Sequence, residues 1–223
     1  MREIVFDTET TGLDPAAGHR VVEIGCVELI NHMPTGETRQ WYLNPQRDMP
    51  EEAFNVHGLS EEFLADKPLF NAVVDDFLTF VDGAVLIAHN ANFDMRFLNA
   101  ELAALDRPNL PKDKVLDTIA LARRKISGAQ YSLDALCRRF NIDLSAREKH
   151  GALLDAELLA EVYLELIGGR QPGLVLASER KEEISGDPAE RKTRPARPHA
   201  PSAAEDAAHQ AFVTKIKDPI WDK

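Results

Sequence analysis

The order of predicted strands and helices in the first 168 residues limits this chain to a few fold architectures. Short apolar or alternating runs between turn residues are typical of strands, and apolar residues spaced three or four apart are typical of amphipathic helices. By these patterns we expect strands at residues 2–7, 21–30, 40–43, 85–88 and 115–116, and helices at 71–81, 93–105, 132–140 and 151–167. Strands first, and then strands interleaved with helices, predict an α/β or α+β domain.

Turn and capping residues give the expected limits of several elements. Residues 33–36, Met-Pro-Thr-Gly, are expected to form the turn before the third strand. Ser132 is the predicted N-cap of one helix, and either Asp117 or Thr118 is expected to cap the helix before it. The pair Gly168-Gly169 is expected to end the last long helix.

The composition is that of an ordinary globular chain, with 44% hydrophobic and 28% charged residues among 223. No apolar run approaches the roughly 18 residues that a membrane span needs. The first residues also lack the apolar stretch of a signal peptide, so we expect a cytoplasmic protein with no membrane partner. Cys26 and Cys137 lie far apart in apolar surroundings, which predicts buried free thiols rather than a disulfide or a zinc site.

The formal net charge of −11 disfavours a broad basic surface for non-specific binding to duplex DNA. It does not exclude an enzyme that acts on nucleic acids. A site for divalent cations needs local carboxylates, and a bound partner protein can supply the affinity for DNA. The acids at the edges of the predicted elements are therefore the residues to consider first.

Asp7 and Glu9 are two residues apart at the end of the first predicted strand, so their side chains leave it on the same face. Two carboxylates on one face repel each other unless a cation is present, and hard oxygen ligands suit Mg²⁺ or Mn²⁺. The pair alone is weak evidence for a metal site, because a solvated strand end followed by a turn has the same residue types.

Asp94 follows a polar segment that begins at His89, directly after an apolar strand and at the head of a predicted helix. An acid in the first helical turn is a common capping residue, and this interpretation would suffice if Asp94 stood alone. However, sites in α/β folds gather at strand ends, which favours a functional role here.

His150 and Asp155 lie at the start of the last long helix. Asp155 stands among alanines and leucines, where an acid is costly unless it is paired or bound to a cation. Histidine titrates near neutral pH, so His150 is a candidate to accept a proton from water. Its alternative role is that of a helix cap.

Taken in order, Asp7, Glu9, Asp94, His150 and Asp155 make the chain resemble the DnaQ-like exonucleases of the DEDDh branch, which have the ribonuclease H-like fold. The motifs stand here as VFDTETTG at 5–12, HNANFD at 89–94 and HGALLDA at 150–156. Four further segments, EIG at 23–25, EAFNVHG at 52–58, SLDALC at 132–137 and AEVY at 160–163, resemble the ε subunits of bacterial DNA polymerase III. The resemblance covers about residues 3 to 169.

The resemblance implies a mixed central sheet flanked by helices, in a DEDDh exonuclease domain at residues 1–169. It implies that Asp7, Glu9, Asp94 and Asp155 hold two divalent cations, Mg²⁺ or Mn²⁺, and that His150 is the general base. Two such cations can stabilise the attacking and leaving oxygens of a phosphodiester. The implied activity is 3′→5′ DNA exonuclease proofreading, which removes mispaired 3′-terminal nucleotides as 5′-monophosphates.

The resemblance also implies contacts to the terminal nucleotide. Glu52 and His57 fall in a segment that touches this nucleotide in the family, and Asp7, Glu9 and Asp155 contact it as well as the cations. Thr10, Thr11 and Phe93 lie beside catalytic acids and are expected to pack on the sugar or the base. Core packing remains an alternative for Phe93, and capping of a loop before Gly58 remains one for His57.

Residues 170–177 resemble the short peptides with which bacterial proteins dock on sliding clamps. Gln171, Leu174 and Leu176 have the required spacing and are the expected clamp contacts. A simple loop that ends the preceding helix is the alternative interpretation.

Residues 178–208 are rich in Glu, Lys, Arg, Pro and Ala, a composition that predicts a disordered linker. Residues 209–223 become apolar again and include Trp221. By resemblance in general design, this tail is expected to dock on the catalytic α subunit of polymerase III, with the linker as a tether. Folding back on the domain is the alternative.

Two other functions remain open at this point. One is an exonuclease of the same branch that trims RNA 3′ ends, although such an enzyme has no obvious need for the linker and tail. The other is an architectural adaptor between clamp and polymerase. Such an adaptor would not need to keep all four acids and the histidine.

Overall fold

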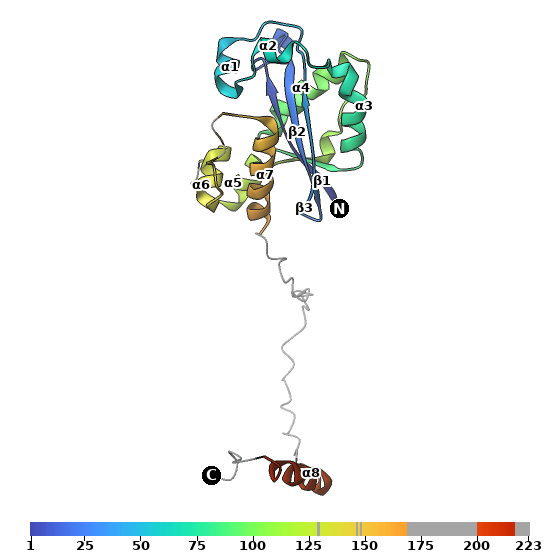
Figure 1. The fold of residues 1–223 in the computed structure, drawn as a ribbon, viewed down its shortest axis with the longest axis vertical. Helices are drawn as coiled ribbons and strands as arrows, with labels where there is room; N and C mark the ends of the chain where they lie inside the picture. The colour runs from blue at the N-terminus through green and yellow to red at the C-terminus, as the bar shows by residue number, and fades with distance from the viewer. Residues whose placement is uncertain (129, 146, 148, 169–199, 217–223) are drawn as a thin grey trace, which may run out of the picture. The chain divides into compact units, whose positions relative to one another are not determined.

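The structure is a computed structural model that describes residues 1–128, 130–145, 147, 149–168 and 200–216. The chain divides into two compact units, Met1–Leu174 and Val175–Lys223. The first unit has a sheet between two layers of helices, as Figure 1 shows. This arrangement confirms the expected ribonuclease H-like architecture of a mixed sheet flanked by helices.

Five strands form the sheet in the order β3-β2-β1-β4-β5. Their bounds are β1 Arg2–Thr10, β2 Val21–Ile30, β3 Met33–Tyr42, β4 Val85–Ala88 and β5 Val115–Asp117. The first three strands pair in antiparallel fashion, whereas β4 is parallel to β1 and β5 is parallel to β4. The strand expected at 2–7 continues to residue 10, so Asp7 and Glu9 both lie inside it.

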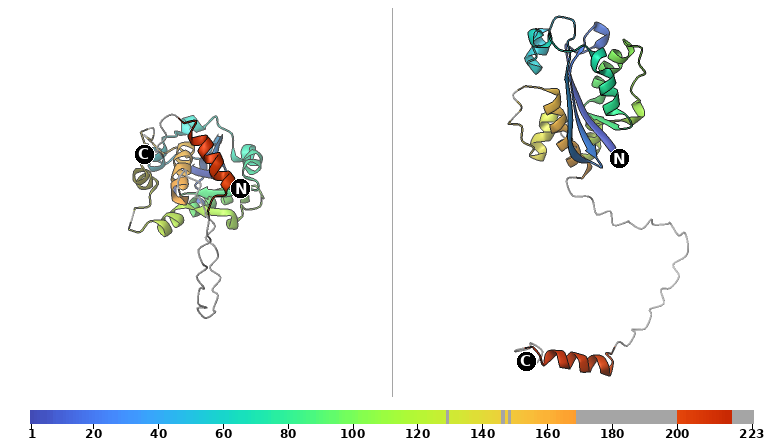
Figure 2. Two further views of the ribbon diagram at one scale, coloured as in Figure 1. Left: turned by 90° about the horizontal axis from the view of Figure 1, so that it is seen from below. Right: turned by 45° about the vertical axis from the view of Figure 1, so that its right-hand side comes forward.

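Helices cover both faces of the sheet (Figure 2). Their bounds are α1 Glu51–His57, α2 Glu61–Leu64, α3 Phe70–Val81, α4 Ala91–Ala103, α5 Thr118–Lys125, α6 Leu133–Phe140 and α7 Ala152–Ile167, with 3₁₀ turns η1 Pro15–Ala17 and η2 Lys112–Lys114. One buried cluster joins the sheet to α3 and α4, and a second joins it to α5, α6 and α7. The predicted caps are confirmed, since Ser132 accepts from Ala135 N and Asp117 accepts from Ile119 N.

The alternation of β1 decides which layer receives its acids. Ile4 and Phe6 belong to the cluster with α3 and α4, whereas Val5 belongs to the cluster with α7. Successive side chains of a strand point to opposite faces. Asp7 and Glu9 therefore share the face of Val5 and point toward α7.

The turn between β2 and β3 differs from the sequence expectation. Residues 33–36 lie inside β3, and the turn is formed by Asn31 and His32, which have φ angles of 50° and 67°. Two residues with positive φ give a hairpin turn whose twist matches that of the strands. Pro34 is tolerated because β3 is an edge strand. Since most of β3 is exposed and polar, its sequence has little apolar alternation to reveal it.

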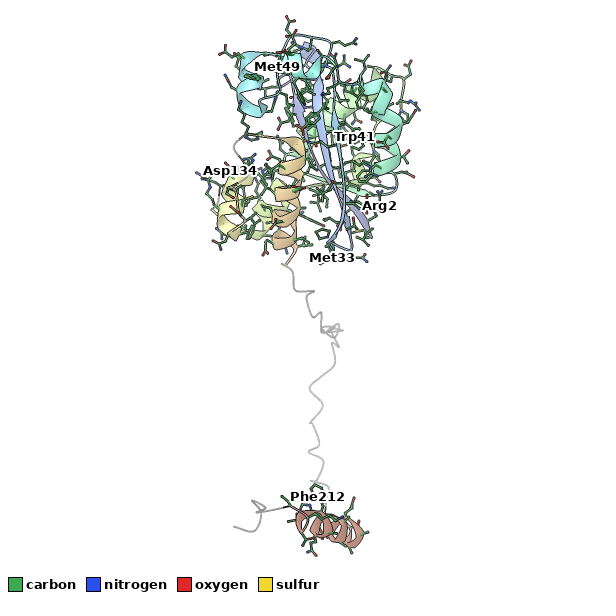
Figure 3. All side chains as sticks on the ribbon, in the orientation of Figure 1. Arg2, Met33, Trp41, Met49, Asp134 and Phe212 are labelled. Carbon is green, nitrogen blue, oxygen red and sulfur yellow. The ribbon has the colours of Figure 1, made fainter. Side chains whose placement is uncertain are left out.

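Figure 3 shows that side chains fill the space on both sides of the sheet, with Trp41 labelled on β3. The Trp41 ring stands edge-on to Phe77 of α3, with ring centroids 5.8 Å apart. Cys26 and Cys137 are buried and free, as expected. The short helices α1 and α2 were not predicted, because one or two turns show too little periodicity.

In the second unit the structure describes one helix, α8 Ala203–Val213. It begins inside the range expected to be linker, because Ser202 and Glu205 form a capping box before an alanine-rich stretch. The predicted boundary at residue 208 therefore falls within a helix. The expected contacts Gln171, Leu174, Leu176 and Trp221 lie outside the described residues. Within the described ranges, no helix has the length and apolar character needed to cross a bilayer.

Candidate active site

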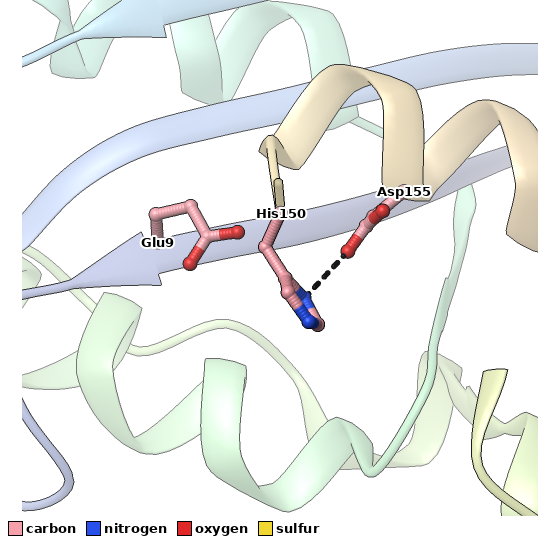
Figure 4. A group of neighbouring side chains, drawn as sticks. All are labelled: Glu9, His150 and Asp155. Atoms are coloured by element: carbon pink, nitrogen blue, oxygen red, sulfur yellow. Dashed lines mark hydrogen bonds and ion pairs between the residues drawn. The ribbon is translucent and has the colours of Figure 1, made fainter. Parts of the chain in front are cut away.

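One cavity of about 700 Å³ brings together the four acids and the histidine that the sequence singled out. Asp7 and Glu9 come from β1, Asp94 from the first turn of α4, and Asp155 from the first turn of α7. His150 lies just before α7, and Figure 4 shows its side chain between those of Glu9 and Asp155. Residues far apart in sequence thus meet in one cavity.

The closest group within this cavity contains Glu9, His150 and Asp155, whose ligand atoms all lie within 4.8 Å of one another. His150 Nδ1 is 3.1 Å from Asp155 Oδ2. Asp94 Oδ1 accepts from the backbone N and the hydroxyl of Thr8, at 3.1 and 2.6 Å, which fixes the direction of this carboxylate. Asp7 lines the same cavity outside the closest group.

Three of the acids in this cavity, Asp7, Glu9 and Asp94, have raised pKa values. Burial, and then the charges of Asp94 and Glu9, raise the pKa of Asp7 well above its ordinary value. Burial is also the main cause that raises the pKa of Glu9 to about 8 and that of Asp94 to about 7. A set of buried carboxylate oxygens that is hard to ionise without a counter-charge fits hard divalent cations.

Asp155 has the opposite shift. Burial opposes its ionisation, but hydrogen bonds from His150 and Arg147 outweigh the burial and lower its pKa. Asp155 is therefore the acid that is charged most readily when no cation is bound.

These shifts predict how pH affects the cation-free protein. Because the pKa of Glu9 is raised from 4.5 to about 8, its contribution to folding stability is complete below pH 4.5 and is lost as pH rises through 8. Asp94 acts in the same direction. We expect the melting temperature in a chelator to fall from about pH 5 to about pH 8, and the rise on adding Mg²⁺ to grow over that range. A Mg²⁺-induced rise that is equal at all pH values would contradict this.

The close approach of α7 to β2 places His150 and Asp155 against the strand acids. Gly25 lies opposite Asp7 in the sheet register, and a Cβ atom on it would come within 2.2 Å of Leu153 N. The buried Glu23 lies two residues earlier on the same strand. Burial raises its pKa, while Gln40 and the backbone of Ala152 stabilise its charged form. Glycine at position 25 therefore lets the start of α7 lie directly on the sheet.

A second, mainly apolar cavity of about 490 Å³ shares Thr8, Glu9 and Phe93 with the first. Six of the eight expected substrate contacts line it, namely Glu9, Thr10, Thr11, Glu52, His57 and Phe93, whereas Asp7 and Asp155 line the first cavity alone. Phe93 is half-buried and also packs against the core, with its ring 5.0 Å from that of Phe97. Core packing is therefore observed for Phe93, while its contact with a nucleotide stays a prediction.

The polar side chains of the second cavity, His57 and Thr10, differ in the hydrogen bonds that they make. His57 Nδ1 accepts from Leu59 N at 3.0 Å, so His57 also caps its loop. This bond places the ring proton on Nε2, which is buried and makes no hydrogen bond of good geometry among the described residues, although the backbone carbonyl of Thr10 is near enough to favour a proton on the ring. Burial lowers the pKa of His57 to about 4, so the ring is a neutral donor. By contrast, the Thr10 hydroxyl already donates to Gly12 O at 2.6 Å.

Sequence reasoning did not identify Arg147, Asp134, Arg123 and Tyr131, which also line the first cavity. They lie in loops or on short helices, where no periodic pattern marks one side chain as inward. For Arg147 the only signal is its position three residues before His150.

The sequence profile of the family described as "Exonuclease" matches residues 4–163, and so covers the sheet, both helix layers and both cavities. This chain belongs to the exonuclease family. The subunit epsilon of DNA polymerase III from Rickettsia felis is 47% identical over 222 residues, which cover 97% of this chain and 97% of that protein. The subunit epsilon from Escherichia coli is 49% identical over 177 residues, or 76% of this chain and 72% of that protein.

Solved structures support the same assignment of the exonuclease domain. Exonuclease X in complex with 5′-overhanging duplex DNA is 27% identical, with a TM-score of 0.57, and the match covers 74% of this chain and 90% of that one. The nuclease domain of 3′hExo, described as a DEDDh family member bound to rAMP, has a TM-score of 0.65 at 18% identity, over 74% and 91% of the two chains. At that identity the second match shows the fold alone.

Proposed function

We propose that this exonuclease removes nucleotides one at a time from DNA 3′ ends, as the proofreading subunit of a bacterial DNA polymerase III in the cytoplasm. The observation that carries the proposal is the cavity that collects Asp7, Glu9, Asp94, His150 and Asp155. The relatives named DNA polymerase III subunit epsilon, which match across most of this chain, support the assignment to DNA replication.

The four acids would hold two divalent cations, Mg²⁺ or Mn²⁺. When bound, such cations stabilise the negative charge that develops on the attacking and leaving oxygens of a phosphodiester. The carboxylates come from three separate elements of the fold, so cations held by them would also tie β1, α4 and α7 together at the site. We therefore expect cation binding to stabilise the fold as well as to support hydrolysis.

His150 would accept the proton of the attacking water. Its Nδ1 lies 3.1 Å from Asp155 Oδ2, and a proton donated along this bond leaves the lone pair of Nε2 for the water. In the reaction a bond forms between the water oxygen and the phosphorus, and the bond from phosphorus to the 3′ oxygen breaks. The products are a nucleoside 5′-monophosphate and a strand that is shorter by one nucleotide.

The second cavity would receive the terminal nucleotide. Its mainly apolar lining suits a base and sugar, and His57 Nε2 offers a buried donor that makes no hydrogen bond of good geometry in the described part of the chain. Because the cavity receives a nucleotide that has left its pairing partner, the end of a duplex must fray before hydrolysis. A mispaired end frays at lower cost, which favours the removal of errors.

Assembly with the replication machinery belongs to the same proposal. Gln171, Leu174 and Leu176 would dock the chain on the sliding clamp, and the segment with Trp221 would dock on the α subunit. Phe212 of α8 is 62% exposed in the second unit and is available to join that contact. A tether between the two docking sites would keep the nuclease near the primer end.

The test compares three substrates with the full chain in Mg²⁺: a primer with a mispaired 3′ end, the same primer fully paired, and RNA of the same sequence. We expect stepwise release of nucleoside monophosphates from DNA, fastest at the mispair and abolished by a chelator. Equal rates on paired and mispaired ends would contradict proofreading. Faster hydrolysis of RNA would indicate an RNA-trimming enzyme, and no cation-dependent hydrolysis would indicate an adaptor.

A further inference from the structure

The guanidinium of Arg147 lies inside the catalytic cavity and is paired with the acid at the start of α7. Its Nε and Nη2 atoms each lie 2.6 Å from an oxygen of Asp155, one nitrogen to each oxygen. Its Nη1 pairs with Asp134 of α6, and its Nη2 is 2.8 Å from His150 Nδ1. Only 8% of the Arg147 side chain is exposed, so these are contacts of a buried cation.

This pairing conflicts with the binding of a divalent cation. A fork-like guanidinium uses both oxygens of the Asp155 carboxylate, and these are the oxygens that a metal ion would need. Two cations that share one carboxylate in a buried site repel each other strongly. A divalent cation at Asp155 must therefore displace at least part of the Arg147 fork.

Asp134 is placed to retain Arg147 after such a displacement. It pairs with a different nitrogen of the guanidinium, and it belongs to α6 rather than to α7. Figure 3 marks Asp134 on α6, next to α7. Once released from Asp155, Nε and Nη2 would still face the cavity, where their next acceptor would be a phosphate oxygen of a bound strand.

The contact between Arg147 and His150 also affects which nitrogen of the His150 ring can accept a proton. If Arg147 Nη2 donates to His150 Nδ1, the ring proton lies on Nε2, and Nε2 cannot accept a proton from water. Removing Arg147 from this position allows Nδ1 to donate to Asp155 instead, at the observed distance of 3.1 Å.

We propose that Arg147 is an internal counter-cation that occupies Asp155 until a divalent cation binds, and that Asp134 then holds it in the cavity to bind a phosphate of the substrate strand. The second half of this proposal rests on the proposed exonuclease function. The first half concerns cation binding alone and can be tested without DNA.

The first experiment measures the Kd of Mn²⁺ for the full chain by calorimetry. We expect Arg147→Met to bind Mn²⁺ about tenfold more tightly than the parent chain, because a competing cation has been removed. Arg147→Lys keeps the charge and is expected to bind with nearly the parent affinity. An unchanged or weaker affinity in Arg147→Met would overturn the proposal.

Arg20 offers a matched control, because it forms the same two-nitrogen pair with the buried Glu101, at 2.7 and 2.6 Å, away from this cavity. Arg20→Met is expected to lower the melting temperature and leave the Mn²⁺ affinity unchanged. Arg138→Met removes the other ion-pair partner of Asp134 without touching Asp155, and should also leave it unchanged. A gain in Mn²⁺ affinity in either control would mean that the loss of any ion pair, by destabilising the fold, explains the effect. This result would overturn the proposal.

The second experiment measures hydrolysis of a single-stranded oligonucleotide at saturating Mg²⁺. We expect kcat/KM of Arg147→Met to fall about tenfold, with partial recovery in Arg147→Lys, which keeps the charge and loses the fork. Tighter Mn²⁺ binding together with undiminished kcat/KM would overturn the phosphate contact. If the parent chain hydrolyses no DNA, the exonuclease function fails, while the Mn²⁺ measurement still decides the competition at Asp155.

Discussion

Replacing Asp7 with asparagine is expected to lower the rate of 3′-end hydrolysis by about a thousandfold or more, because several kcal/mol of transition-state stabilisation depend on the bound cations. Burial and the charges of Asp94, Glu9 and Asp155 raise the pKa of Asp7, so this acid lies within the electrostatic influence of the other three. Asparagine keeps the shape of the side chain and removes one of the four carboxylates proposed to hold the cations. Single-turnover hydrolysis of a mispaired primer and the Kd of Mn²⁺ measure the two effects.

The same substitution should have the opposite effect on the cation-free fold. Asp7 faces buried acids, so removing its carboxyl group removes repulsion, and the melting temperature in a chelator should be unchanged or higher. Asp75→Asn is the matched control, because this acid is exposed on α3 and pairs with Arg107. The control should leave both the rate and the Mn²⁺ affinity unchanged. A rate for Asp7→Asn within tenfold of the parent chain would contradict a role for Asp7 in the chemistry.

Replacing Gly25 with alanine is expected to lower the hydrolysis rate about a hundredfold, although Gly25 itself bears no chemical group. A Cβ atom at this position would lie 2.2 Å from Leu153 N and 2.3 Å from Ala152 C, and both are backbone atoms of α7. The helix must therefore move away from β2 and carry Asp155 and His150 with it. A shift of about 1 Å in a catalytic group is enough to reduce a rate about a hundredfold.

The structural cost of this change should be moderate. Forcing an extra methyl group into a packed contact costs about 1–3 kcal/mol, so the variant should still fold. Gly36→Ala serves as the control, because a Cβ atom there would meet no other described residue within 4 Å, while the φ of +88° is strained for alanine. It should lower stability and leave the rate of the folded protein unchanged. A rate for Gly25→Ala equal to that of the control would show that α7 can move without affecting the site.

Much of the architecture could be read from local sequence. The strands at 21–30 and 85–88 agree with the structure residue for residue, because buried apolar runs between turn residues have few other interpretations. The hairpin turn at Asn31-His32 was not found, because the exposed edge strand after it carries little apolar alternation. Where burial is slight, the sequence holds correspondingly little information on the element.

The sequence by itself predicted the four acids and the histidine that the structure brings into one cavity, and it determined which strand face the first two acids share. The alternation of side chains along β1 requires that Asp7 and Glu9 share a face, whatever packs on it. The caps at Asp117 and Ser132 are equally local, because a capping side chain binds the backbone two or three residues away.

Only the tertiary structure decided how these residues act on one another. The raised pKa values of Glu9 and Asp94, the buried donor at Nε2 of His57 and the fork of Arg147 on Asp155 all arise where separate elements pack together. The physical reason is that burial and charge interactions depend on distances through space, which are set by the packing of whole elements. Local sequence patterns assign a residue to a helix or strand and to one face of it. The packing of α7 on the sheet then determines which other side chains that residue contacts.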